Sequence, residues 1–67
     1  MTPERRNYAH KRIVRLTAIL RRINDLIAAR NHSGHPDDVR AREQLMKQRN
    51  STVASIKRWE RQLAEPN

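Results

Sequence analysis

The apolar residues between Ile13 and Ile27 recur at alternating spacings of three and four, and this pattern restricts the possible folds more than any other feature of the chain. The positions that share it are Ile13, Leu16, Leu20, Ile23 and Ile27. Such spacing places the side chains along one side of an α-helix, whereas a half-buried β-strand needs apolar residues at every second position. The segment therefore predicts an amphipathic helix that buries one face.

A first helix is predicted over residues 3–30. Thr2 can cap its start, Pro3 suits the first helical position, and its interior contains neither glycine nor a further proline. The next residues, 31–35, include Gly34, which is the only glycine of the chain. Because glycine tolerates the left-handed conformation that often ends a helix, we expect a turn here that closes through a left-handed residue.

A second helix is predicted over residues 36–64. Pro36 again suits the first helical position, and Asp37 and Asp38 bring negative charge to the positive end of the helix dipole. Pro66 disfavours helical geometry at the residue before it, so the helix should end there.

Two long helices joined by a short turn predict an all-α fold, an antiparallel two-helix hairpin that forms one domain over residues 1–67. Residues whose numbers sum to about 66 then face each other, which places Tyr8 close to Trp59 at the open end. The inner side of the second helix is expected to be less apolar, because it includes three charged residues, Arg42, Arg49 and Glu60.

The first helix also has a second apolar surface. Ile19 and Leu26, with Tyr8 in line, lie about 90° from the centre of the main stripe when each residue turns the helix by about 100°. A stripe this wide suits a bundle of three or four helices, packed like a coiled coil, better than a single pair. We therefore predict a homodimer whose interface contains Tyr8, Ile19 and Leu26 and which forms a four-helix bundle. The alternative is that a different protein or a larger assembly covers this surface.

The chain is strongly basic, with 15 Lys and Arg against 7 Asp and Glu and a net charge of +8. Residues 1–31 carry eight basic and two acidic side chains, a net +6, while residues 32–67 carry seven and five, a net +2. Six of the cations form outward rows at helical spacing, Lys11, Arg15 and Arg22 on the first helix and Arg40, Lys47 and Arg58 on the second. Rows of this kind predict binding to the phosphate backbone of DNA or RNA without reading its sequence.

Two other interpretations of the basic surface remain open at this stage. The rows are also compatible with a solvated face that is partly neutralised by local ion pairs, such as Asp25 with Arg21 and Glu43 with Lys47. An acidic protein partner is the second alternative, in which case the chain is a protein-interaction or assembly module. Because the sequence has only two aromatic residues, stacking on unpaired bases is not the expected mode of binding.

The residue types that ligate metals gather around the turn, at His32, His35, Asp37 and Asp38. Favourable interactions with the two helix ends account for all four, and their spacing does not match a tetrahedral zinc site, so we predict no metal site and no cofactor. The sequence also lacks a nucleophile with an adjacent base and a glycine-rich phosphate loop, which predicts that the protein is not an enzyme.

Cellular location is predicted from three features of the sequence. It has no stretch of roughly 20 apolar residues, which argues against a membrane partner. It has no cysteine, and its first twelve residues are charged where a signal peptide would turn apolar. We therefore expect a cytoplasmic protein.

Overall fold

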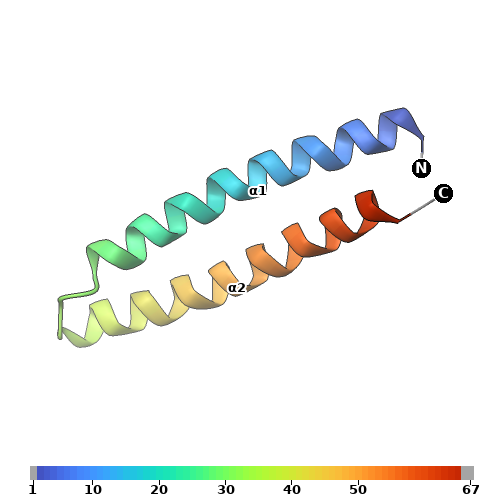
Figure 1. Ribbon diagram of the computed structural model, residues 1–67. Coiled ribbons are helices and arrows are strands. Elements are labelled where there is room, and N and C mark those ends of the chain that lie inside the picture. The colour runs from blue at the N-terminus through green and yellow to red at the C-terminus, as the bar shows by residue number, and fades with distance from the viewer. Residues whose placement is uncertain (1, 66–67) are drawn as a thin grey trace.

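The protein is a hairpin of two antiparallel α-helices that lie side by side along their whole length (Figure 1). The computed structural model describes residues 2–65, in which α1 spans Pro3–Ala29 and α2 spans Pro36–Ala64. The hairpin measures 50 × 15 × 12 Å, and no β-strand occurs among the described residues. The predicted all-α hairpin is thus confirmed, with α1 ending one residue earlier than expected. The predicted role of Pro66 lies outside the described residues.

Both helices begin at the residues that the sequence predicts, although the His35 cap of α2 was not predicted. The Thr2 hydroxyl accepts a hydrogen bond from the backbone N–H of Arg5 at 3.2 Å, and Pro3 occupies the start of α1. In α2, Pro36 occupies the same place, and the His35 ring acts as the cap because its Nδ1 accepts from the backbone N–H of Asp37 at 3.2 Å. Each cap satisfies a backbone donor that the first helical turn leaves without a partner.

The end of α1 differs from the prediction, because no described residue, Gly34 included, adopts a positive φ. The capping residue Arg30 has φ −104° and ψ 4°. Its N–H donates to the carbonyl of Ile27 at 3.1 Å, and the N–H of Asn31 donates to that of Ala28 at 3.2 Å. These bonds reach back three residues and tighten the last turn, so the free carbonyls are satisfied without a left-handed residue.

The turn is held to the start of α2 by side-chain contacts. The hydroxyl of Ser33 donates to Oδ2 of Asp38 at 2.6 Å and accepts from the backbone N–H of His35 at 3.3 Å. Asp38 also faces Arg30, with 3.6 Å between Oδ1 and Nε. These contacts join the turn and the end of α1 to the start of α2.

The core lies on the inner side of α1 and is small. Among the described residues, the buried side chains are Ala9, Leu16 and Ile23, one every seven positions. The remaining members of the predicted stripe, Ile13, Leu20 and Ile27, are half-buried. Ala9 was not predicted as a core residue, since its methyl group contributes little to an apolar pattern, yet it is fully buried. The rings of Tyr8 and Trp59 meet edge to face with 5.6 Å between centroids, which confirms the predicted register.

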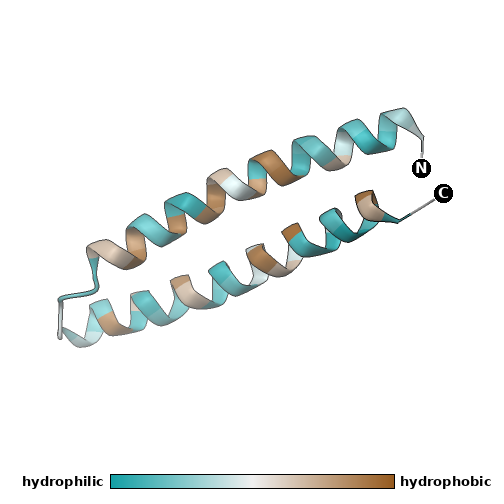
Figure 2. Ribbon diagram, in the orientation of Figure 1, coloured by the Kyte–Doolittle hydropathy of each residue, from teal (hydrophilic) through white to brown (hydrophobic). Residues whose placement is uncertain are grey.

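The inner side of α2 is more polar, and no residue of α2 is fully buried. Seven of its half-buried residues recur at spacings of three and four along the line of contact with α1, and they are Arg42, Leu45, Arg49, Thr52, Ile56, Trp59 and Leu63. Figure 2 shows the result, with apolar segments of α2 separated by hydrophilic ones. Arg42 donates to the carbonyl of Asn31 at 3.5 Å. The prediction for Glu60 was wrong, because Trp59 and Leu63 occupy the contact line and leave Glu60 exposed.

Candidate nucleic-acid interface

The cations predicted on the outer side of α1, Lys11, Arg15 and Arg22, are all exposed. At about 100° per residue they lie roughly 120° from the direction of the buried core. We refer to these three residues as the α1 row. These three side chains face solvent because the buried residues Leu16 and Ile23 lie on another side of the helix.

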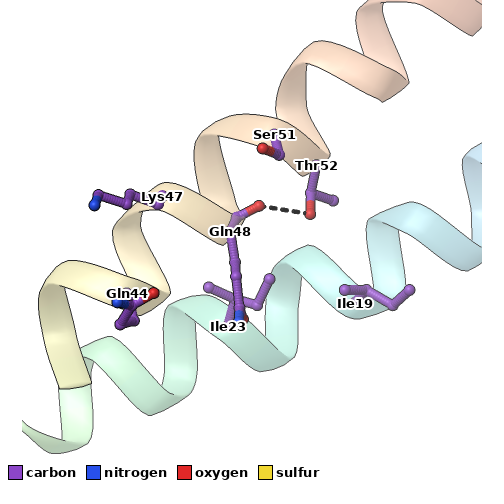
Figure 3. A pocket seen from close by; sticks show the side chains of 7 residues that line it. All are labelled: Ile19, Ile23, Gln44, Lys47, Gln48, Ser51 and Thr52. Carbon is purple, nitrogen blue, oxygen red and sulfur yellow. Dashed lines mark hydrogen bonds between the residues drawn. The ribbon is translucent and has the colours of Figure 1, made fainter.

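A second set of predicted cations, the α2 row of Arg40, Lys47 and Arg58, is also exposed. It lies on the outer side of the other helix, so the hairpin carries one row on each of its long sides. The middle residue of this row reaches the edge of a groove between the helices, lined by Ile19, Ile23, Gln44, Lys47, Gln48, Ser51 and Thr52 (Figure 3). The hydroxyl of Thr52 donates to the carbonyl of Gln48 at 2.8 Å, so it is satisfied within its own helix.

The positive charge of both rows is not neutralised by neighbouring carboxylates. Within residues 2–65, the only Lys or Arg side chain within 4.0 Å of a carboxylate is Arg30, which faces Asp38. The local ion pairs of the alternative interpretation, Asp25 with Arg21 and Glu43 with Lys47, are not formed. Such pairs gain little energy in water and lose side-chain entropy, which explains their absence on an exposed helix surface.

Three large apolar side chains are exposed on one flank of α1. The exposed fractions are 55% for Tyr8, 44% for Ile19 and 38% for Leu26. These residues are the predicted dimer interface, and we refer to them as the apolar flank. A single hairpin leaves the flank facing solvent, although Ile19 borders the groove and Tyr8 contacts Trp59.

Some surface features were missed by reasoning from the sequence. Val14 is the most exposed of the large apolar residues, at 70%, and Met46 is exposed as well. Lys57 and Arg61 join Arg58 around a shallow hollow on α2 whose fourth lining residue is Ala54. Lys57 and Arg58 follow Ala54 by three and four residues, the spacing of neighbours on a helix surface. The sequence analysis considered only cations aligned in one row along the helix, and so it included only Arg58.

His35 and Asp38, two of the possible metal ligands around the turn, make hydrogen bonds that cap α2 and hold the turn. Within the part of the chain that the structure describes, no three His, Cys, Asp or Glu side chains converge as metal ligands would. Nδ1 of His35 is 3.8 Å from Oδ2 of Asp37 as well as 3.2 Å from its backbone N–H. The shorter contact is the hydrogen bond that caps α2.

Comparison with known proteins finds no match for this chain among protein-family models, curated proteins or solved structures. Among the described residues, neither helix has the length and apolar character that crossing a bilayer demands. The expected cytoplasmic location stays a prediction.

Proposed function

We propose that this protein is a small, non-catalytic binding module whose α1 row contacts the phosphate backbone of double-stranded DNA or RNA. The observation that carries the proposal is the exposure of Lys11, Arg15 and Arg22 on one outer side of α1, with no carboxylate within ion-pair distance among the described residues. Each cation that neutralises a phosphate releases condensed counterions, and this gain in entropy drives binding at low salt.

The spacing of the α1 row suits a polyanion. Lys11 and Arg15 are separated by about 6 Å along the helix axis and Arg15 and Arg22 by about 10 Å, at a rise of 1.5 Å per residue. A nucleic-acid duplex presents charges at closer intervals than these, so each long side chain finds a phosphate within its reach. The row therefore suits a phosphate backbone of any sequence.

The aromatic residues support duplex binding over stacking on unpaired bases. Tyr8 and Trp59 are the only aromatic residues of the chain, and they pack against each other with an angle of 70° between the ring planes. Proteins that bind single strands offer ring faces on which successive bases stack. Here the two rings are engaged with each other at the end of the hairpin, away from the centre of the α1 row.

The functional unit proposed here is a homodimer, in which the apolar flanks of two hairpins meet to form a four-helix bundle. The buried core of one hairpin consists of only Ala9, Leu16 and Ile23 among the described residues, which is little for two helices of this length. Covering the flank would add about 1 kcal/mol for each partly exposed side chain, roughly half the value for full burial. A closed two-fold dimer is the simplest assembly that achieves this.

Titration of a labelled duplex tests the nucleic-acid proposal. The test variant carries Lys11→Gln, Arg15→Gln and Arg22→Gln. A charge-matched control carries three substitutions on α1 outside the row, Arg5→Gln, Arg6→Gln and Arg21→Gln. Fluorescence anisotropy at about 50 mM salt, where electrostatic binding is strong, should show a large loss of affinity for the test variant and a small loss for the control. Equal losses would mean that net charge matters and the row does not.

A second candidate function is a protein-interaction or assembly module with no role in nucleic-acid binding. It is favoured by the apolar flank, since surfaces of exposed apolar side chains rimmed by charges mark contacts between proteins. The cationic surface would then attract an acidic protein. If the parent protein binds neither DNA nor RNA duplexes at about 50 mM salt, this candidate becomes the better account.

A further inference from the structure

A compact group of cations lies on the outer side of α2, near the open end of the hairpin. Lys57, Arg58 and Arg61 surround Ala54, and together these four exposed residues line a shallow hollow. The methyl group of Ala54 is small, so the floor of the hollow stays open between three long basic side chains. None of the three lies within 4.0 Å of a carboxylate among the described residues. We refer to this group as the outer hollow.

The outer hollow faces away from the α1 row. At about 100° per residue, Ala54 lies nearly opposite the side of α2 that contacts α1, and Arg58 and Arg61 lie on either side of it. The α1 row likewise lies on the side of α1 that faces away from α2. Because the helices are side by side (Figure 1), these two basic surfaces are on opposite long sides of the hairpin. A duplex that lies along one of them does not contact the other.

We propose that one hairpin bridges two nucleic-acid duplexes, with one phosphate backbone on the α1 row and a second in the outer hollow. This inference rests on the proposed function and adds a second site to it. The hollow suits a phosphate group, because two guanidinium groups can each donate paired hydrogen bonds to its oxygens while the ammonium group of Lys57 supplies a further charge. The three cations make the second contact strongly dependent on salt.

Co-capture of two duplexes by the full chain tests the proposal. A duplex attached to beads is incubated with protein and with a second, fluorescent duplex, and the fluorescence retained on the beads is measured. At about 50 mM salt the parent protein should retain the second duplex. The association constant of the hollow for the second duplex should fall by about 40-fold between 50 and 200 mM salt if the hollow neutralises three phosphates.

A double variant, Lys57→Gln with Arg61→Gln, separates the two sites. It should still bind the beads' duplex through the α1 row, which contains neither residue, and it should lose at least nine-tenths of the co-captured fluorescence. Both side chains are exposed, so helix content by circular dichroism should be unchanged. As a charge control, Arg6→Gln with Arg21→Gln removes the same charge outside the hollow and should keep co-capture.

The possible failures are distinguishable. If the parent binds a single duplex but retains no second one, the bridging proposal is overturned and the proposed function stands. If the Lys57 and Arg61 double variant still co-captures as well as the parent, bridging arises elsewhere, such as from two α1 rows in a dimer, and the outer hollow has no part in it. If the parent binds no duplex at all, both the proposed function and the bridging proposal fail.

Discussion

Replacing Gly34 by alanine should stabilise the hairpin, even though glycine in a turn often serves a conformation that other residues avoid. Gly34 does not adopt a positive φ, so alanine fits its backbone. A methyl group added there would meet no atom within 4 Å, so the substitution introduces no clash. The effect then comes from the unfolded chain, which loses more conformational freedom on folding with glycine than with alanine.

The expected gain is about 0.4–1 kcal/mol, the range for a Gly to Ala change that leaves the native conformation unstrained. For a domain of this size each kcal/mol corresponds to about 4–8 °C in melting temperature, so the Tm should rise by about 2–8 °C. Protein concentration has to be held constant between samples, because dimerisation would make the Tm depend on it.

Thermal unfolding followed by far-ultraviolet circular dichroism measures this change. Ser33→Ala is the matched control in the same turn, and it should lower the Tm because it removes the 2.6 Å hydrogen bond to Asp38 and the acceptor for the His35 N–H. A loss of about 1–2 kcal/mol in the Gly34 variant, the cost of alanine in a left-handed conformation, would refute the reasoning. Such a loss would also mean that Gly34 adopts the left-handed conformation that was predicted from the sequence.

Other substitutions address the core, the cap and the dimer. Ile23→Ala removes a buried side chain and should cost about 2–4 kcal/mol in urea unfolding, whereas Val14→Ser, at a site 70% exposed, should change stability by less than about 0.5 kcal/mol. His35→Ala removes the cap of α2 and should cost about 0.5–2 kcal/mol in thermal unfolding; an unchanged Tm would mean that the 3.2 Å contact contributes nothing. Leu26→Glu should halve the mass measured by light scattering at tens of micromolar. Val14→Glu introduces the same charge away from the flank and should leave the dimer intact. A parent protein that is already monomeric would rule the dimer out.

Much of the fold could be predicted from the sequence because the signals are local. The apolar spacing of α1 indicates a long helix, and the prolines at positions 3 and 36 mark where the two helices begin. The segment around Gly34 interrupts the helical pattern, so the two helices fold back on each other as a hairpin. The conformation of Gly34 could not be predicted, since glycine permits a left-handed residue without requiring one. Glu60 was misplaced because a fixed turn of 100° per residue drifts over a long helix that packs at seven-residue spacing.

The candidate site could be predicted in part. The exposure of the α1 row follows directly from the position of the core on the opposite side of the helix. The outer hollow was missed because it depends on how three long side chains gather around a small one, at Ala54, and no single row contains them all. The local ion pairs of the alternative interpretation do not form, because spacing brings two charges within reach but does not offset the entropy lost when flexible side chains pair in water.

The salt dependence of duplex binding tests the central claim most directly. Plotting the logarithm of the association constant against that of the salt concentration gives a slope of about −0.9 for each phosphate neutralised. In a background that carries Lys57→Gln and Arg61→Gln to remove the outer hollow, replacing Lys11, Arg15 and Arg22 by glutamine should reduce the slope by about 2.7 in magnitude, equally on duplexes of unrelated sequence, with helix content unchanged. If the triple replacement leaves the slope of that background unchanged, or if the parent binds neither DNA nor RNA at about 50 mM salt, the α1 row is not a nucleic-acid interface.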